Sequence, residues 1–106
     1  MLLFTTKQLL DRTVNRQGIT SGVYVLYDEH KQVLKVGSDA SILSALGSLM
    51  LFPHSDIQYL ASRNPDSHLW EFALFTLEEC IIVNGLPANT TLQEAEAFYQ
   101  SRYNHA

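Results

Sequence analysis

The sequence is poor in cysteine, in basic residues and in long apolar runs, and each shortage excludes a class of protein. Cys80 is the single cysteine, so internal disulfides and metal sites built from cysteine pairs are excluded. Seven basic residues against eleven acidic ones give a net charge of −4, which disfavours nucleic acid as a partner because its binding depends on clustered cations. No apolar run has the length of a membrane span or the form of a secretory signal, so we expect a cytoplasmic protein with no membrane partner.

Proline and glycine are scattered as well as few, with three prolines and five glycines in 106 residues. No segment is rich enough in either to form a linker, and nothing repeats at a fixed period. Hydrophobic residues make up 46% of the chain, which at this length is enough for one modest core and too little for two. We therefore expect a single domain over residues 1–106.

Hydrophobic spacing predicts an α+β fold with a small three-stranded sheet, antiparallel or mixed, flanked by helices. The expected strands cover residues 22–27, 32–37 and 69–75. The first of them is apolar on both faces, which places it at the centre of the sheet. Helices are expected after four capping positions, which are Thr5 or Thr6 (to about residue 15), Ser38 or Asp39 (to Pro53), Ser55 or Asp56 (a short helix before a turn at 64–67), and Thr90 or Thr91 (to Tyr103).

The segment 78–83 carries two conflicting signals. Thr76 and Glu79 form a possible capping box, which favours a helix, whereas the run Cys-Ile-Ile-Val favours a strand. We predict a helix that ends at Asn84-Gly85.

Two triplets bound the expected hairpin, Gly-Val-Tyr at 22–24 and Lys-Val-Gly at 35–37, with ten residues between them. An amphipathic helix, a third strand and a last helix follow, and the last helix carries Glu-Ala-Glu at 94–96 before Tyr-Asn at 103–104. This order of features resembles the GIY-YIG nuclease superfamily. The resemblance extends over residues 22–104 and rests on order and spacing, because each motif is short.

The resemblance implies cleavage of phosphodiester bonds with one divalent metal ion, Mg²⁺ or Mn²⁺. Members of the family use two tyrosines, an arginine on the following helix, a metal-binding glutamate and a late asparagine. Carried over, these roles fall on Tyr24 as the first tyrosine, on Glu94 as the metal ligand with Glu96 as the alternative, and on Asn104 as the asparagine. Lys35 stands where the second tyrosine is expected.

The chain departs from the family pattern in its positive charge. The arginine would fall near Ala45, yet no lysine or arginine occurs in residues 36–62. If the chain is an active nuclease, Arg63, Arg102 or Lys35 replaces the lost arginine. Loss of one preorganised charge stabiliser costs on the order of 10²–10³ in rate in other enzymes, and here two positions are altered together. The pattern therefore indicates a retained fold with weakened or lost nuclease chemistry and no resident cofactor.

Each of these residues also has a structural interpretation. A tyrosine in a central strand is first a core aromatic, and glutamates at the start of a helix favour its dipole without any metal. Together with the net charge of −4, these structural interpretations favour a degenerate, non-catalytic domain that binds a protein partner, with self-association as a further option. Two alternatives remain: an active, divergent metal-dependent endonuclease, and a small acidic accessory, immunity or inhibitor protein unrelated to the family.

Overall fold

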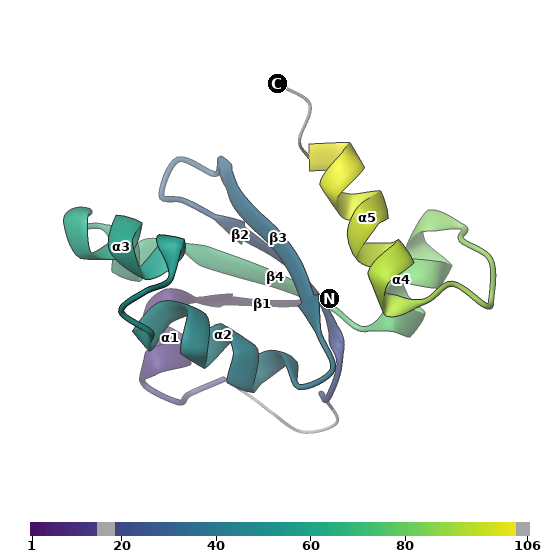
Figure 1. Cartoon of the computed structure of the whole chain (residues 1–106), viewed down its shortest axis with the longest axis horizontal. Helices are drawn as coiled ribbons and strands as arrows, with labels where there is room; N and C mark the ends of the chain where they lie inside the picture. Colours follow the sequence, from purple (N-terminus) through teal and green to yellow (C-terminus); the bar gives the residue numbers. More distant parts are fainter. Residues whose placement is uncertain (15–18, 104–106) are drawn as a thin grey trace.

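Four antiparallel strands form one sheet in the part of the chain that this computed structural model describes, residues 1–14 and 19–103 (Figure 1). The strands are β1 (Leu2–Thr5), β2 (Gly22–Tyr27), β3 (Val33–Asp39) and β4 (Glu71–Phe75), in the spatial order β1-β4-β2-β3. The α+β class is confirmed, as is the central position of the Gly22–Tyr27 strand. The expected count of three strands is wrong, because β1 pairs with β4 and adds a fourth.

Five α-helices surround the sheet in the described residues. They are α1 (Thr6–Leu10), α2 (Ile42–Leu51), α3 (Asp56–Arg63), α4 (Leu77–Asn84) and α5 (Leu92–Tyr103), with a short 3-10 turn at Ser67–Leu69. The segment 78–83 is helical, as the Thr76–Glu79 capping box predicts. The helix α1 ends at Leu10 and not near residue 15, because Arg12 adopts a left-handed backbone conformation with a φ of 58°.

Both faces of the sheet are covered by helices, which explains why β2 is apolar on both sides. The helices α1, α2 and α3 pack on one face around Phe72 and Leu26, and α4 and α5 pack on the other around Val25 and Cys80 (Figure 1). The buried Cys80 therefore acts as a small core residue. None of the helices in the described ranges has the length and apolar character needed to cross a membrane.

Candidate functional site

The glycines of the two triplets are required by packing. Tyr24 on β2 lies directly opposite Gly37 on β3, and a Cβ atom on Gly37 would stand 2.6 Å from the Tyr24 hydroxyl. A Cβ atom on Gly22 would stand 2.5 Å from the carbonyl oxygen of Phe75. Both distances are far below van der Waals contact. The Tyr24 ring therefore lies across β3 at Gly37, where a residue larger than glycine would leave no space for it.

Tyr24 lines a cavity of about 370 Å³ at the β3 edge of the sheet. The cavity lies where α5 packs alongside β3, so residues from two strands and two helices meet there. The residues that line it are Tyr24, Lys35, Val36, Gly37, Ser38, Asp39, Ala45, Glu96 and Gln100. The two triplets and the last helix, which are far apart in the sequence, thus contribute to one cavity.

Glu96 is the glutamate that α5 presents to this cavity, and its carboxylate is already engaged. The Ser38 hydroxyl donates to Glu96 Oε1 at 2.8 Å, and Gln100 Nε2 donates to Glu96 Oε2 at 3.4 Å. The side chain is half-buried. These contacts fix the carboxylate beside the end of β3.

The environment of Tyr24 keeps its phenol protonated. Burial, the largest cause, and the negative charges of Glu96 and Asp39 together raise the pKa of Tyr24 to about 12. The ring is buried against Phe72 in an edge-to-face arrangement, with ring centroids 6.0 Å apart. Tyr24 therefore combines a core packing role with a hydroxyl that reaches the cavity.

Positive charge in the cavity comes from Lys35 alone among the residues that line it. Its side chain is exposed and makes no ion pair within 4.0 Å in the described part of the chain. Ala45, near which the resemblance places an arginine, lines the cavity with a methyl group. The site thus contains two carboxylates and one solvated ammonium group.

Neither of the two candidate replacement arginines lines the cavity. The Arg63 guanidinium stacks over the Tyr59 ring, 4.4 Å from its centroid, on α3. Arg102 on α5 donates from Nη1 to Asn84 Oδ1 at 3.4 Å. Both are engaged by aromatic or polar neighbours outside the Tyr24 cavity.

Glu94 lies apart from the cavity and caps α5. Its carboxylate accepts a hydrogen bond from the Thr91 amide at 3.1 Å, and the Thr91 hydroxyl accepts one from the Glu94 amide at 3.2 Å. The hydrogen bonds from Thr91 lower the pKa of Glu94. Asn104, the remaining predicted site residue, lies outside the described residues. The structure thus brings Tyr24 and Lys35 together with Glu96, and not with Glu94.

The donor set of the cavity is a poor match to a divalent metal ion. Within residues 1–14 and 19–103, no three histidine, cysteine, aspartate or glutamate side chains converge as metal ligands would. Both oxygens of Glu96 accept hydrogen bonds from neighbouring side chains. Asp39 is the other carboxylate among the described residues that line the cavity, so at most two carboxylates could reach a metal ion there.

The sequence did not indicate that Ser38, Asp39 and Gln100 belong to this site. Ser38 and Asp39 were expected only as helix caps, whereas both lie at the end of β3 and Asp39 closes the strand. The one available signal for Gln100 is its spacing of four residues from Glu96, which puts the two on the same face of a helix.

Compared with models of known protein families, with curated proteins and with solved structures, the chain has no match.

Proposed function

We propose that this chain is a degenerate GIY-YIG-like domain without nuclease activity that acts by binding a protein partner. The observation that carries the proposal is the charge of the Tyr24 cavity, in which a phenol with a pKa of about 12 lies beside two carboxylates. No arginine of residues 1–14 or 19–103 lines this cavity.

Phosphodiester cleavage of the family type is disfavoured by these charges. A tyrosine with a pKa of about 12 is ionised in roughly one molecule in 10⁵ at neutral pH, so the phenolate that would act as the base is scarcely populated there. Glu96 and Asp39 repel the phosphate that a nuclease has to stabilise. The described residues also contain no group of three metal-ligating side chains to hold the metal ion that would offset this repulsion.

A protein partner is favoured by the surface. The net charge of −4 disfavours nucleic acid, and several large apolar side chains are exposed on the helices. They include Leu51, Phe52, Tyr59 and Leu60 near α2 and α3, and Ile82, Val83 and Phe98 on α4 and α5. Exposed aromatic and aliphatic groups free of charge are typical of protein interfaces.

One observation favours a second candidate, a divergent metal-dependent endonuclease. Tyr24, Lys35 and Glu96 line the same cavity, which is the juxtaposition that an active site of this family would need. In that case Glu96 and not Glu94 holds the metal-binding position.

A cleavage assay separates the two candidates. Labelled single- and double-stranded DNA and RNA are incubated with Mn²⁺ and the wild-type protein, Glu96→Gln or Glu94→Gln. We expect no cutting by any of them. Cutting by the wild type that only Glu96→Gln abolishes would establish the nuclease. Cutting that only Glu94→Gln abolishes would place the metal ligand at the start of α5. That result would contradict both the non-catalytic proposal and a nuclease with Glu96 as its metal ligand.

Protein binding is tested separately by affinity capture followed by reconstitution. Captured proteins are purified and titrated into the wild-type chain, and we expect saturable binding by at least one of them. Sedimentation of the isolated chain over a range of concentrations measures self-association. A chain that stays monomeric and shows saturable binding to none of the captured proteins would contradict the proposal.

A further inference from the structure

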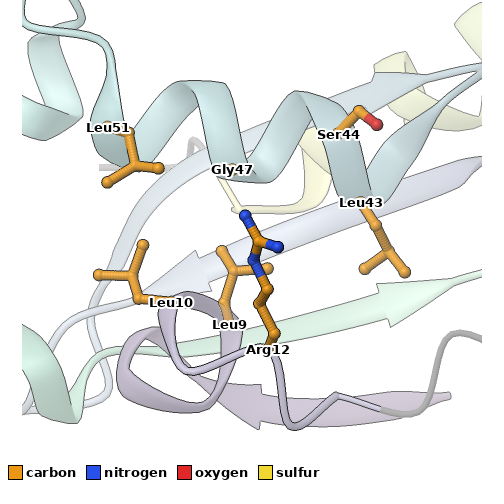
Figure 2. A pocket seen from close by; sticks show the side chains of 7 residues that line it. All are labelled: Leu9, Leu10, Arg12, Leu43, Ser44, Gly47 and Leu51. Atoms are coloured by element: carbon orange, nitrogen blue, oxygen red, sulfur yellow. The ribbon is translucent and has the colours of Figure 1, made fainter.

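A second cavity of about 370 Å³ lies between α1 and α2, on the face of the sheet that α4 and α5 do not cover (Figure 2). Leu9, Leu10, Leu43 and Leu51 supply its apolar walls. Gly47 on α2 leaves room on the opposite side, since a Cβ atom there would have no neighbour within 4 Å. The cavity therefore combines leucine walls with polar surface that includes Arg12 and Ser44, and it has free space beside the helix.

The cavity is open to solvent. Leu51 is 68% exposed and Leu10 is 43% exposed, although both line it. Sites for small molecules bury most of the ligand surface, and this one is too open to do so. A single anchoring side chain from a protein partner needs less enclosure, because the rest of the partner covers the rim.

The helix α2 presents no charge around this cavity. Residues 40–53 contain no lysine, arginine, aspartate, glutamate or histidine. Leu51 and the neighbouring Phe52, which is also exposed, extend the apolar surface beyond the cavity. Depletion of charge together with exposed aliphatic and aromatic groups is the composition of an interface centre and not of a solvated helix face.

Among the described residues that line the cavity, Arg12 is the one that carries a charge. Its side chain extends from the end of α1 toward α2 and Gly47 (Figure 2). Asp11, the adjacent acid, is paired with Lys7, and Arg12 makes no ion pair within the described ranges. Its φ of 58° belongs to a region that favours glycine, so a side chain is kept here at a conformational cost.

We propose that this cavity docks a short acidic segment of a partner protein. One leucine-sized side chain of that segment enters between α1 and α2, and a neighbouring carboxylate pairs with Arg12. The inference rests on the proposed protein-binding function and names the place and the chemistry of the contact. The net negative charge of the chain opposes an acidic partner only weakly, because solvent ions screen charges beyond about 8–10 Å, whereas Arg12 acts in direct contact.

The test uses two synthetic peptides and isotope-labelled protein followed by NMR. The acidic peptide is acetyl-Glu-Leu-Leu-Glu-amide and its counterpart is acetyl-Lys-Leu-Leu-Lys-amide. We expect the acidic peptide to shift the amide signals of Leu10, Ser44 and Gly47 and to bind about tenfold more tightly than the basic one. The preference is expected to weaken at high salt.

Two pairs of variants assign the contact. Gly47→Leu fills the cavity and abolishes binding, whereas Gly47→Ala gains nearly the same helix propensity without filling it and keeps binding. Both are expected to stay folded because space is available at this position. Arg12→Gln removes the preference for the acidic peptide, and Arg102→Gln, which removes a cation from α5, leaves the preference unchanged.

Four outcomes would overturn the docking site. They are shifts that map to another surface, equal binding of the two peptides, unaltered binding by Gly47→Leu, and no binding at millimolar peptide. The cleavage assay on the same preparations keeps this test apart from the proposed function. Cutting contradicts the non-catalytic function, whereas a failed peptide test without cutting contradicts the docking site alone.

Discussion

At the scale of single residues, Gly37 determines whether the Tyr24 site can form. A methyl group there would collide with the ring, and a buried tyrosine in a central strand has little room to move. We predict that Gly37→Ala lowers the free energy of unfolding by about 1–3 kcal/mol. Urea denaturation measures the change.

The control for this substitution is Gly47→Ala. The Gly47 position has open space, so alanine is expected to stabilise the helix by up to about 1 kcal/mol. Equal effects of the two substitutions would contradict the steric role of Gly37.

The charges near Tyr24 give a second prediction at this scale. Glu96→Gln removes one of the two carboxylates that raise the pKa of Tyr24, while burial, the largest cause, remains. We therefore expect the pKa to fall below 12 and to stay above 10. Alkaline titration followed by the NMR signals of the Tyr24 ring measures it. Glu94→Gln, which alters the cap of α5, is expected to leave this pKa unchanged, and an equal fall in both variants would contradict the assignment of Glu96.

At the scale of secondary structure, the start of α5 depends on the reciprocal hydrogen bonds between Thr91 and Glu94. Removing the carboxylate with Glu94→Ala is expected to destabilise the first turn of the helix at neutral pH. Hydrogen exchange of the first amides of α5 and urea denaturation measure the loss. Glu96→Gln serves as the control, because Glu96 caps nothing.

The pH dependence of this cap follows from the lowered pKa of Glu94. A group whose pKa is lower in the folded state stabilises that state above its unfolded pKa, and the contribution is lost as the pH falls through the folded value. The difference between wild type and Glu94→Ala is therefore expected to shrink as the pH falls below 4.5. A difference that persists in strong acid would show that the carboxylate does not act through its charge.

Most elements could be predicted because their signals are local. The capping residues Ser55 and Thr76 each accept a hydrogen bond from the amide three positions along, which is a relation the sequence displays directly. The strand β1 has only four residues and forms because it pairs with β4. The paired residues of β4 lie about seventy positions further along the chain. No local pattern of four residues reveals such a pairing.

The choice between Glu94 and Glu96 could not be made from the sequence for a related reason. Two residues apart on a helix means a separation of roughly 200° around its axis, so only one of them can face β3. Which one does so depends on how α5 packs on the sheet. That packing places Glu96 against Ser38 and leaves Glu94 at the exposed cap.

At the scale of the whole molecule, the sheet separates two cores and β2 contributes a tyrosine to each. Tyr24 packs with the α1–α3 layer, and Tyr27 packs with the α4–α5 layer beside Tyr103. The Tyr24 cavity lies at the β3 edge, where residues of both layers meet. The ionisation of these two tyrosines therefore affects both layers of the fold.

Alkaline stability is the prediction that follows from this arrangement. The pKa of Tyr24 and that of Tyr27 are both raised to about 12 from an ordinary value of 10.0, mainly by burial, with help from the nearby carboxylates at Tyr24 and from Tyr103 at Tyr27. Above pH 10 the unfolded chain loses these protons first, so the folded state binds more protons and the free energy of unfolding falls as the pH rises toward 12. Tyr24 alone is expected to contribute a loss of about 1–2 kcal/mol over this range.

Tyr24→Phe and Tyr27→Phe separate the two layers. Each variant lacks one ionisable phenol and keeps the aromatic ring, so each is expected to show a shallower fall in stability between pH 10 and 12 than the wild type. The double variant is expected to show the shallowest fall. Because both pKa values are raised to about 12, the two single substitutions are expected to change the slope by similar amounts. If the double variant loses stability as steeply as the wild type, the alkaline transition arises elsewhere in the molecule, and the two tyrosines do not couple ionisation to folding.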